Sequence, residues 1–80
     1  TGLGTDAMRT ILSVAFETLN LNRVSLTVYE TNPRAIRCYE SLGFAHEGID
    51  REGVFRQGRY INVIRMGMLA REWRASAATG

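Results

Sequence analysis

The chain has 80 residues, 45% of them hydrophobic and 22% charged, and its ten basic and eight acidic residues give a net charge of +2. One cysteine excludes an internal disulfide, and one cysteine with one histidine cannot supply the set of ligands that a structural zinc ion needs. A chain of this size buries only about 60% of the surface it exposes when unfolded, so we expect one soluble domain with a thin core.

Several classes of partner and location are also disfavoured. No apolar run is long enough to cross a membrane, so we expect no membrane partner. All ten basic residues are arginines and they are scattered along the chain, so we expect no nucleic-acid partner. A single cysteine and the lack of an export signal predict a cytoplasmic location.

The first half of the chain predicts a helix, a strand and a second helix. Apolar residues recur at helical spacing at Met8, Ile11, Leu12, Ala15, Phe16 and Leu19. Alternation of β-branched and polar residues over Val24–Glu30 then predicts a strand. Asn32 can cap the next helix and Pro33 suits its first position, whereas Gly43 is typical of a left-handed residue that ends a helix.

The second half predicts an antiparallel hairpin. Strands are expected at about Phe44–Asp50 and Tyr60–Leu69, because apolar residues there recur at every second position. Between them, Glu52–Arg59 is expected to form a long, bulged loop, with Gly53 and Gly58 as turn signals.

The resulting fold class is mixed α/β (α+β): helix, strand, helix and then an antiparallel hairpin. The hairpin and the strand at Val24–Glu30 give a three-stranded sheet whose edge beside Val24–Glu30 is open. Trp73 is expected to end the ordered domain, residues 1–73, and residues 74–80 are expected to form a flexible tail of small side chains.

The glycines at the start of the chain indicate an anion-binding site. Gly2 and Gly4 let a ligand approach the backbone, and the free N–H groups of a helix start attract a pyrophosphate. A Walker-type loop is excluded, because no Gly-Lys-Ser/Thr follows. A dinucleotide-binding alternative stays open. Gly2, Gly4 and Ala7 fit the pattern Gly-x-Gly-x-x-Gly/Ala, and Glu30 lies where a ribose-binding acid is expected. The strand that should precede the glycines in that fold is absent, however.

The segment from Asn32 to Phe44 points to a particular family. Its residues Asn32, Ala35, Tyr39 and Gly43-Phe44 follow the pattern Asn-x-x-Ala-x-x-x-Tyr-x-x-x-Gly-Phe. This pattern resembles that of the GNAT superfamily of N-acetyltransferases, most of all its ribosomal-protein N-terminal and spermidine acetyltransferase branch. The opening glycines resemble the end of that family's Gln/Arg-x-x-Gly-x-Gly/Ala loop, and residues 51–66 also suit the branch, so the resemblance covers nearly all of residues 1–73.

The resemblance implies acetyl-CoA as cofactor and gives candidate residues for it. The backbone of Gly2, Leu3, Gly4 and Thr5 would bind the pyrophosphate, in agreement with the anion site expected at a helix start. Asn32 matches a position that contacts the pantetheine region, although a simple helix cap explains it equally well.

Tyr39 matches the tyrosine that gives a proton to the departing CoA thiolate, so it is the catalytic candidate. A phenol keeps its proton at neutral pH and can donate it to a thiolate. The other interpretation of Tyr39 is a core tyrosine on the apolar face of its helix. Cys38 and His46 are not expected to act as a nucleophile and base, because no signature pairs them; a half-buried cysteine and a histidine on a strand surface are the simpler expectations.

The resemblance implies an enzyme that moves acetyl from acetyl-CoA to a primary amine, but family members are about twice as long. The chain therefore resembles their C-terminal half, either as a fragment or as a processed protein. We expect it to act as a homo-oligomer, such as a dimer, or with a complementing N-terminal half, since an open strand edge invites pairing. A non-catalytic remnant or interaction domain that still binds CoA is the alternative.

Overall fold

The computed structural model describes residues 3–79, with side chains from residue 6 to residue 75. The mixed α+β class is confirmed, and the predicted order of helix, strand, helix and hairpin is followed by a further helix. In chain order the elements are α1 (Leu3–Ser13), the π-helical turn η1 (Val14–Thr18), β1 (Arg23–Tyr29), α2 (Pro33–Leu42), β2 (Ala45–Arg56), β3 (Arg59–Leu69) and α3 (Ala70–Thr79).

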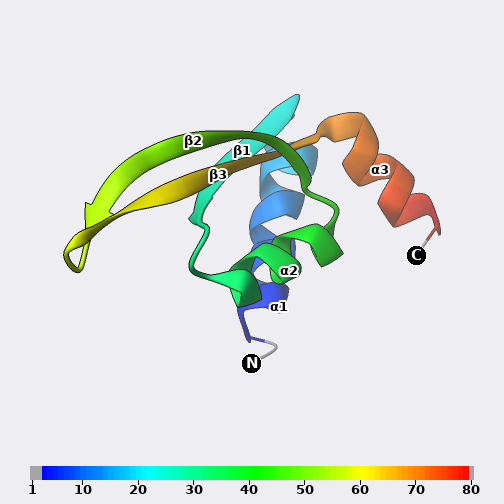
Figure 1. Cartoon of the computed structure of the whole chain (residues 1–80). Coiled ribbons are helices and arrows are strands. Elements are labelled where there is room, and N and C mark those ends of the chain that lie inside the picture. Colours follow the sequence, from blue (N-terminus) through cyan, green and yellow to red (C-terminus); the bar gives the residue numbers. More distant parts are fainter. Residues whose placement is uncertain (1–2, 80) are drawn as a thin grey trace.

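The three strands form one antiparallel sheet in the order β1-β3-β2. β3 is therefore central, and Met66 in its middle lies opposite Leu26 of β1 and His46 of β2. Within the described residues β1 has a neighbour on one side only, so the open edge expected beside Val24–Glu30 is confirmed. Figure 1 shows α1 and α2 beneath the same face of the sheet and α3 continuing from the end of β3.

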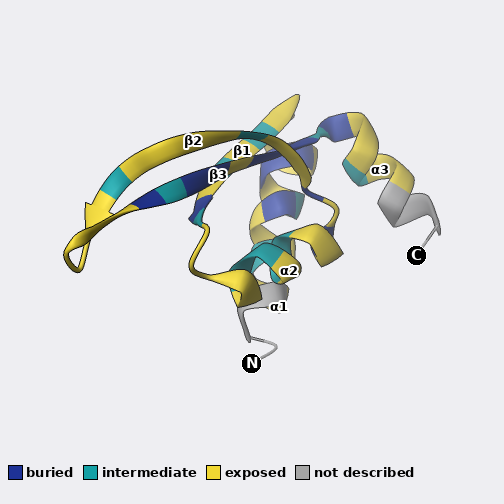
Figure 2. Cartoon of the chain, viewed as in Figure 1, coloured by how far each residue is buried: buried dark blue, intermediate teal, exposed yellow. Residues whose placement is uncertain are grey.

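The core lies between that face of the sheet and the two helices. Ile64, Met66 and Met68 alternate along β3 and pack with Leu12 and Phe16 in one buried cluster. Figure 2 shows buried stretches along β3 and on α1, whereas the far end of the hairpin is exposed. Alternation along β3 places Val63, Arg65 and Gly67 on the opposite face, which no described helix covers.

The apolar stripe predicted for the first helix is only partly right. Leu12 and Phe16 are 0% and 1% exposed, but Ile11 and Leu19 are 58% and 62% exposed. The exposure of Leu19 follows from η1. There the Leu19 N–H donates at 2.8 Å to the carbonyl of Val14, five residues earlier, whereas in an α-helix the acceptor lies four residues earlier. A π-helical turn takes more residues than an α-helical one, so the positions after it rotate away from the predicted stripe.

The predicted loop at Glu52–Arg59 is wrong, because most of it belongs to the strands. β2 continues to Arg56, and only Gln57-Gly58 joins it to β3. Both turn residues have positive φ, 53° and 81°, as in the tight turns that match strand twist. The extra residues form a bulge between Asp50 and Val54, held by the Glu52 N–H, which donates to Asn62 Oδ1 at 2.8 Å. Gly53 is thus part of a bulge and not a turn residue, whereas Gly58 is one.

The residues after Trp73 are helical up to Thr79, where we expected a tail. The alanines in this segment have a high helix propensity, so they are compatible with a helix as well as with a tail. The start of α3 is capped by Glu72, whose Oε1 accepts from the Leu69 N–H at 2.8 Å. Trp73 fixes α3 to the core: its Nε1 donates to Glu17 Oε2 at 2.7 Å and its ring stacks on Phe16 with 5.9 Å between centroids. The flexibility of the tail and the domain boundary at residue 73 stay predictions.

Gly43 is confirmed as the left-handed end of α2, with φ of 109°. Its conformation turns the chain directly into β2, since the Gly43 N–H bonds the Glu40 carbonyl and the Phe44 N–H bonds the Tyr39 carbonyl. In the part of the chain described, no helix is long and apolar enough to cross a membrane. The cytoplasmic location stays a prediction.

Candidate functional site

The cap and the second turn of α2 place Asn32 and Tyr39 near the carboxyl end of β1. Asn32 caps the helix, with its Oδ1 accepting from the Ala35 N–H at 3.2 Å, and Pro33 occupies the first helical position as expected. A hollow of about 300 Å³ opens here, lined by Thr27, Val28, Tyr29, Asn32, Ala35 and Tyr39. Two of the side chains predicted for the site therefore face one hollow.

The position of Tyr39 is compatible with both interpretations that the sequence left open for it. Its ring is half-buried, packs against the core cluster and meets Phe44 edge to face at 5.7 Å, so it is a core residue. Within the described part of the chain, its hydroxyl makes no hydrogen bond, although the residue lines the hollow. A fixed ring with an unengaged hydroxyl is the arrangement that a proton donor to a bound ligand needs.

The predicted pyrophosphate loop is described only in part. Leu3, Gly4 and Thr5 form the first turn of α1, whose first N–H groups have no acceptor within the helix. Gly2 lies outside the described residues. α1 contacts α2, and Figure 1 shows the first turn of α1 beside α2, so the helix start and the Asn32–Tyr39 hollow belong to one side of the molecule.

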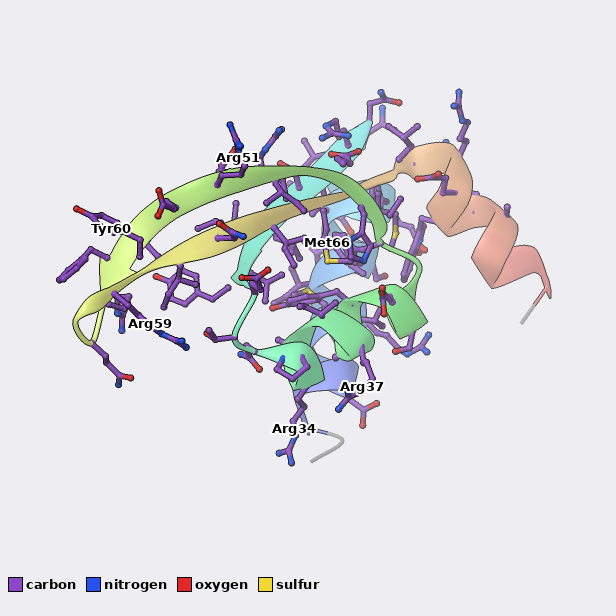
Figure 3. The ribbon with its side chains drawn as sticks, viewed as in Figure 1. Arg34, Arg37, Arg51, Arg59, Tyr60 and Met66 are labelled. Atoms are coloured by element: carbon purple, nitrogen blue, oxygen red, sulfur yellow. The ribbon has the colours of Figure 1, made fainter. Side chains whose placement is uncertain are left out.

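Arg34 and Arg37 are cations near this helix start that the sequence reasoning did not single out. They are one helical turn apart on α2, and Figure 3 shows both projecting on the side away from the sheet, toward the start of α1. Both side chains are exposed, and neither forms an ion pair within residues 6–75. Their spacing of three residues in a helix was the available signal. Arg9 is also exposed, on α1.

A second, smaller hollow adjoins the first through Tyr29. It measures about 130 Å³ and is lined by Tyr29, Thr31, Arg56, Gln57 and Ile61. The Arg56 guanidinium lies 5.4 Å from the centre of the Tyr29 ring, and its Nη1 donates to the Tyr29 hydroxyl at 3.1 Å. The end of the hairpin thus reaches over the end of β1.

The uncovered face of the sheet carries ion pairs. Arg23 of β1 reaches across β3 to Glu47 of β2 and donates from Nη1 to Oε2 at 2.6 Å and from Nη2 to Oε1. These hydrogen bonds lower the pKa of Glu47 and raise the pKa of Arg23. The bridge depends on Gly67 beneath it, since a Cβ at that position would lie 2.7 Å from the Glu47 carboxyl carbon.

Cys38 and His46 do not form a catalytic pair. Cys38 is half-buried and packs against the core, whereas His46 is exposed on β2 and its Nε2 lies 2.6 Å from Glu40 Oε2. Both simpler expectations are confirmed. Among the described residues there is also no group of side chains that could hold a metal ion.

The sheet argues against the dinucleotide-binding alternative. That fold needs neighbouring parallel strands, but every strand pair described here is antiparallel. Glu30, the candidate ribose-binding acid, accepts a hydrogen bond from Asn62 Nδ2 of β3 at 3.4 Å.

An antiparallel three-stranded sheet with two helices on one face and one open edge defines a partial α+β domain, and its fold is of the acetyltransferase type. Comparison with known proteins supports this class. A solved structure of variant forms of the spermidine/spermine N-acetyltransferase SpeG from Vibrio cholerae superposes with a TM-score of 0.91 at 34% identity, over 95% of this chain and 44% of that one.

A family model for the Acetyltransferase (GNAT) family matches residues 1–44, and the chain belongs to this family. YdaF of Bacillus subtilis (strain 168), provisionally named a ribosomal N-acetyltransferase, is 35% identical over 90% of this chain and 39% of its own length. The spermidine N(1)-acetyltransferase of Escherichia coli (strain K12) is 36% identical over 98% of this chain and 42% of its own. The chain therefore spans about two fifths of the relatives that it matches.

Proposed function

We propose that the chain is the acetyl-CoA-binding part of an N-acetyltransferase that moves an acetyl group to a primary amine. The family uses acetyl-CoA in general, and the observation that carries the proposal is the hollow shared by Asn32 and Tyr39. When bound, the thioester supplies an acetyl group activated for attack by an amine.

Each predicted site residue has a defined role in this proposal. In this proposal the backbone N–H groups of Gly2, Leu3, Gly4 and Thr5 bind the pyrophosphate. Those of Leu3, Gly4 and Thr5 open α1, where they lack acceptors within the helix and stand at the positive end of the helix dipole. Asn32 fixes the start of α2 and offers its amide to the pantetheine region. The amine nitrogen bonds to the acetyl carbon, the carbon–sulfur bond of the thioester breaks, and Tyr39 donates its proton to the departing sulfur. The proton that the amine loses passes to solvent or to a base outside this chain.

Two measurements separate binding from catalysis. Isothermal titration should show that CoA binds and that Gly4→Pro weakens it, because proline removes an N–H donor at the helix start. Thiol release from acetyl-CoA in the presence of an amine should fall about 10²- to 10⁴-fold in Tyr39→Phe, as for loss of a general acid. Tyr60→Phe is the matched control, since Tyr60 is exposed on the hairpin and lies outside the hollow. Absence of CoA binding would refute the proposal.

A non-catalytic CoA-binding or interaction domain is the second candidate function. It is favoured by the short span of the chain relative to its relatives, because much of an acceptor site would have to come from elsewhere. CoA binding without turnover, in the presence of a panel of amines, would support it. Turnover that is lost in Tyr39→Phe would exclude it.

We also propose that β1 pairs with another chain, either a second copy or a complementing N-terminal half. An unpaired strand edge is a template for pairing, and Val24 and Leu26 beside it are only half-buried. Light scattering during size exclusion should give the mass of a dimer or a larger assembly for the chain alone. A stable, well-folded monomer would count against the homo-oligomer.

A further inference from the structure

The described walls of the two hollows that share Tyr29 carry a positive charge and no negative charge. Their walls are mostly neutral, with Thr27, Val28, Asn32, Ala35 and Tyr39 around the larger hollow and Thr31, Gln57 and Ile61 around the smaller one. Arg56 is the charged residue in these walls, and no acidic residue lines either hollow among the described residues. Glu30 lies nearby in the chain, but its carboxylate accepts from the Asn62 amide and is not part of either wall.

A second arginine lies beside Arg56. Arg59 is its direct partner across the two strands, on either side of the Gln57-Gly58 turn. Residues directly opposite each other in an antiparallel pair project from the same face, and like charges at such positions destabilise the pair. Figure 3 shows Arg59 at the end of the hairpin, and it forms no ion pair within the described residues. A bound anion would remove this repulsion.

The Arg56 side chain is held in a position to bind such an anion. Its guanidinium is fixed by the face and the hydroxyl of Tyr29, at 5.4 and 3.1 Å, which uses one of the five N–H donors of an arginine. The remaining donors suit a carboxylate, which accepts the parallel pair of hydrogen bonds that a guanidinium offers. Because Tyr29 also lines the Tyr39 hollow, an anion held here lies next to the site proposed for acetyl transfer.

We propose that the acceptor is a primary amine that also carries a carboxylate, and that Arg56, with Arg59 beside it, binds this carboxylate. The proposal rests on the proposed function and names the substrate class of the same site. In the part of the site that this chain supplies, the ammonium groups of a polyamine such as spermidine would meet a guanidinium and no carboxylate.

Isothermal titration of the whole chain tests this directly. L-Glutamate, spermidine and ethanolamine are titrated into the chain with and without saturating CoA. Glutamate should bind most tightly, and Arg56→Gln should weaken it about tenfold, the effect expected from losing a charge-assisted pair of hydrogen bonds. Arg59→Gln should weaken it less, and ethanolamine binding should not change. Arg71→Gln, on exposed α3, is the matched control.

A further variant separates charge from folding. Arg56→Lys keeps the charge but not the planar fork, so it should retain more glutamate affinity than Arg56→Gln at an equal urea midpoint. Spermidine binding more tightly than glutamate, no measurable glutamate binding, or equal losses in Arg56→Gln and Arg71→Gln would each overturn the inference. Loss of CoA binding alone would instead refute the proposed function, because glutamate selectivity is also measured without CoA.

Discussion

Asn32 offers the sharpest test of how the fold supports the site, since one side chain has two proposed roles. Its Oδ1 accepts from the Ala35 N–H at 3.2 Å and its residue lines the hollow with Tyr39. Replacing an Asn cap by alanine costs about 1 kcal/mol. For a domain of this size that loss corresponds to a fall in Tm of about 4–8 °C. Thermal unfolding followed by circular dichroism measures it.

Asn32→Asp then separates the cap from the cofactor contact. Aspartate caps a helix as well as asparagine does, so stability should return to the wild-type level, but the carboxylate has no amide N–H to donate. We expect Asn32→Ala to lose both stability and CoA affinity, and Asn32→Asp to recover stability alone. An unchanged Tm in Asn32→Ala would refute the capping argument. Full recovery of CoA affinity in Asn32→Asp would show that the amide makes no contact with the cofactor.

Three further variants test the core, the charged face and the turn. Leu12→Ala should lose about 2–5 kcal/mol of unfolding free energy in urea, because Leu12 is 0% exposed, whereas its neighbour Ile11→Ala, at an exposed site, should lose far less. Glu47→Gln should be less stable than wild type at pH 7. Because Arg23 lowers the pKa of Glu47 in the folded state, the difference in unfolding free energy between the two proteins should shrink as the pH falls below the ordinary carboxyl value of 4.5. An equal difference at pH 7 and pH 3 would contradict this. Gly58→Ala should lower the urea midpoint through backbone strain at φ of 81°, where a Cβ would have open space, and an unchanged midpoint would rule out that strain.

Local signals in the sequence were sufficient for the elements that depend on their own residues. The α2 helix was predicted from Asn32-Pro33 at its start and Gly43 at its end, and the structure confirms both caps. The resemblance of the same segment to the acetyltransferase family pointed to Tyr39, which the structure places in the wall of the hollow with Asn32, about two helical turns away. Such caps act through the nearest backbone groups, so they can be recognised without knowing the rest of the fold.

Other features depended on an irregular helical turn or on contacts with another element, and they were missed. The loop expected at Glu52–Arg59 became a bulged strand because Asn62, from the opposite strand, binds the Glu52 backbone. Leu19 left its predicted stripe because a π-helical turn precedes it, and residues 74–79 became helical beyond an anchored Trp73. Asn62 lies ten positions after Glu52, and Trp73 is itself held by Glu17, 56 positions earlier, whereas the π-helical turn acts on the residue that directly follows it.

The sequence by itself determined the family and the caps of α2, since a motif is a property of a continuous segment. The resemblance to that family pointed to Asn32 and Tyr39, which line the larger hollow. Only the tertiary structure decided that Arg56 lies on Tyr29, 27 positions earlier in the chain, and that the second hollow adjoins the first. The hairpin is curved (Figure 1), and bulges in β2 bend a strand in this way. The bulges and the strand register depend on pairing between two segments, so no single segment specifies them.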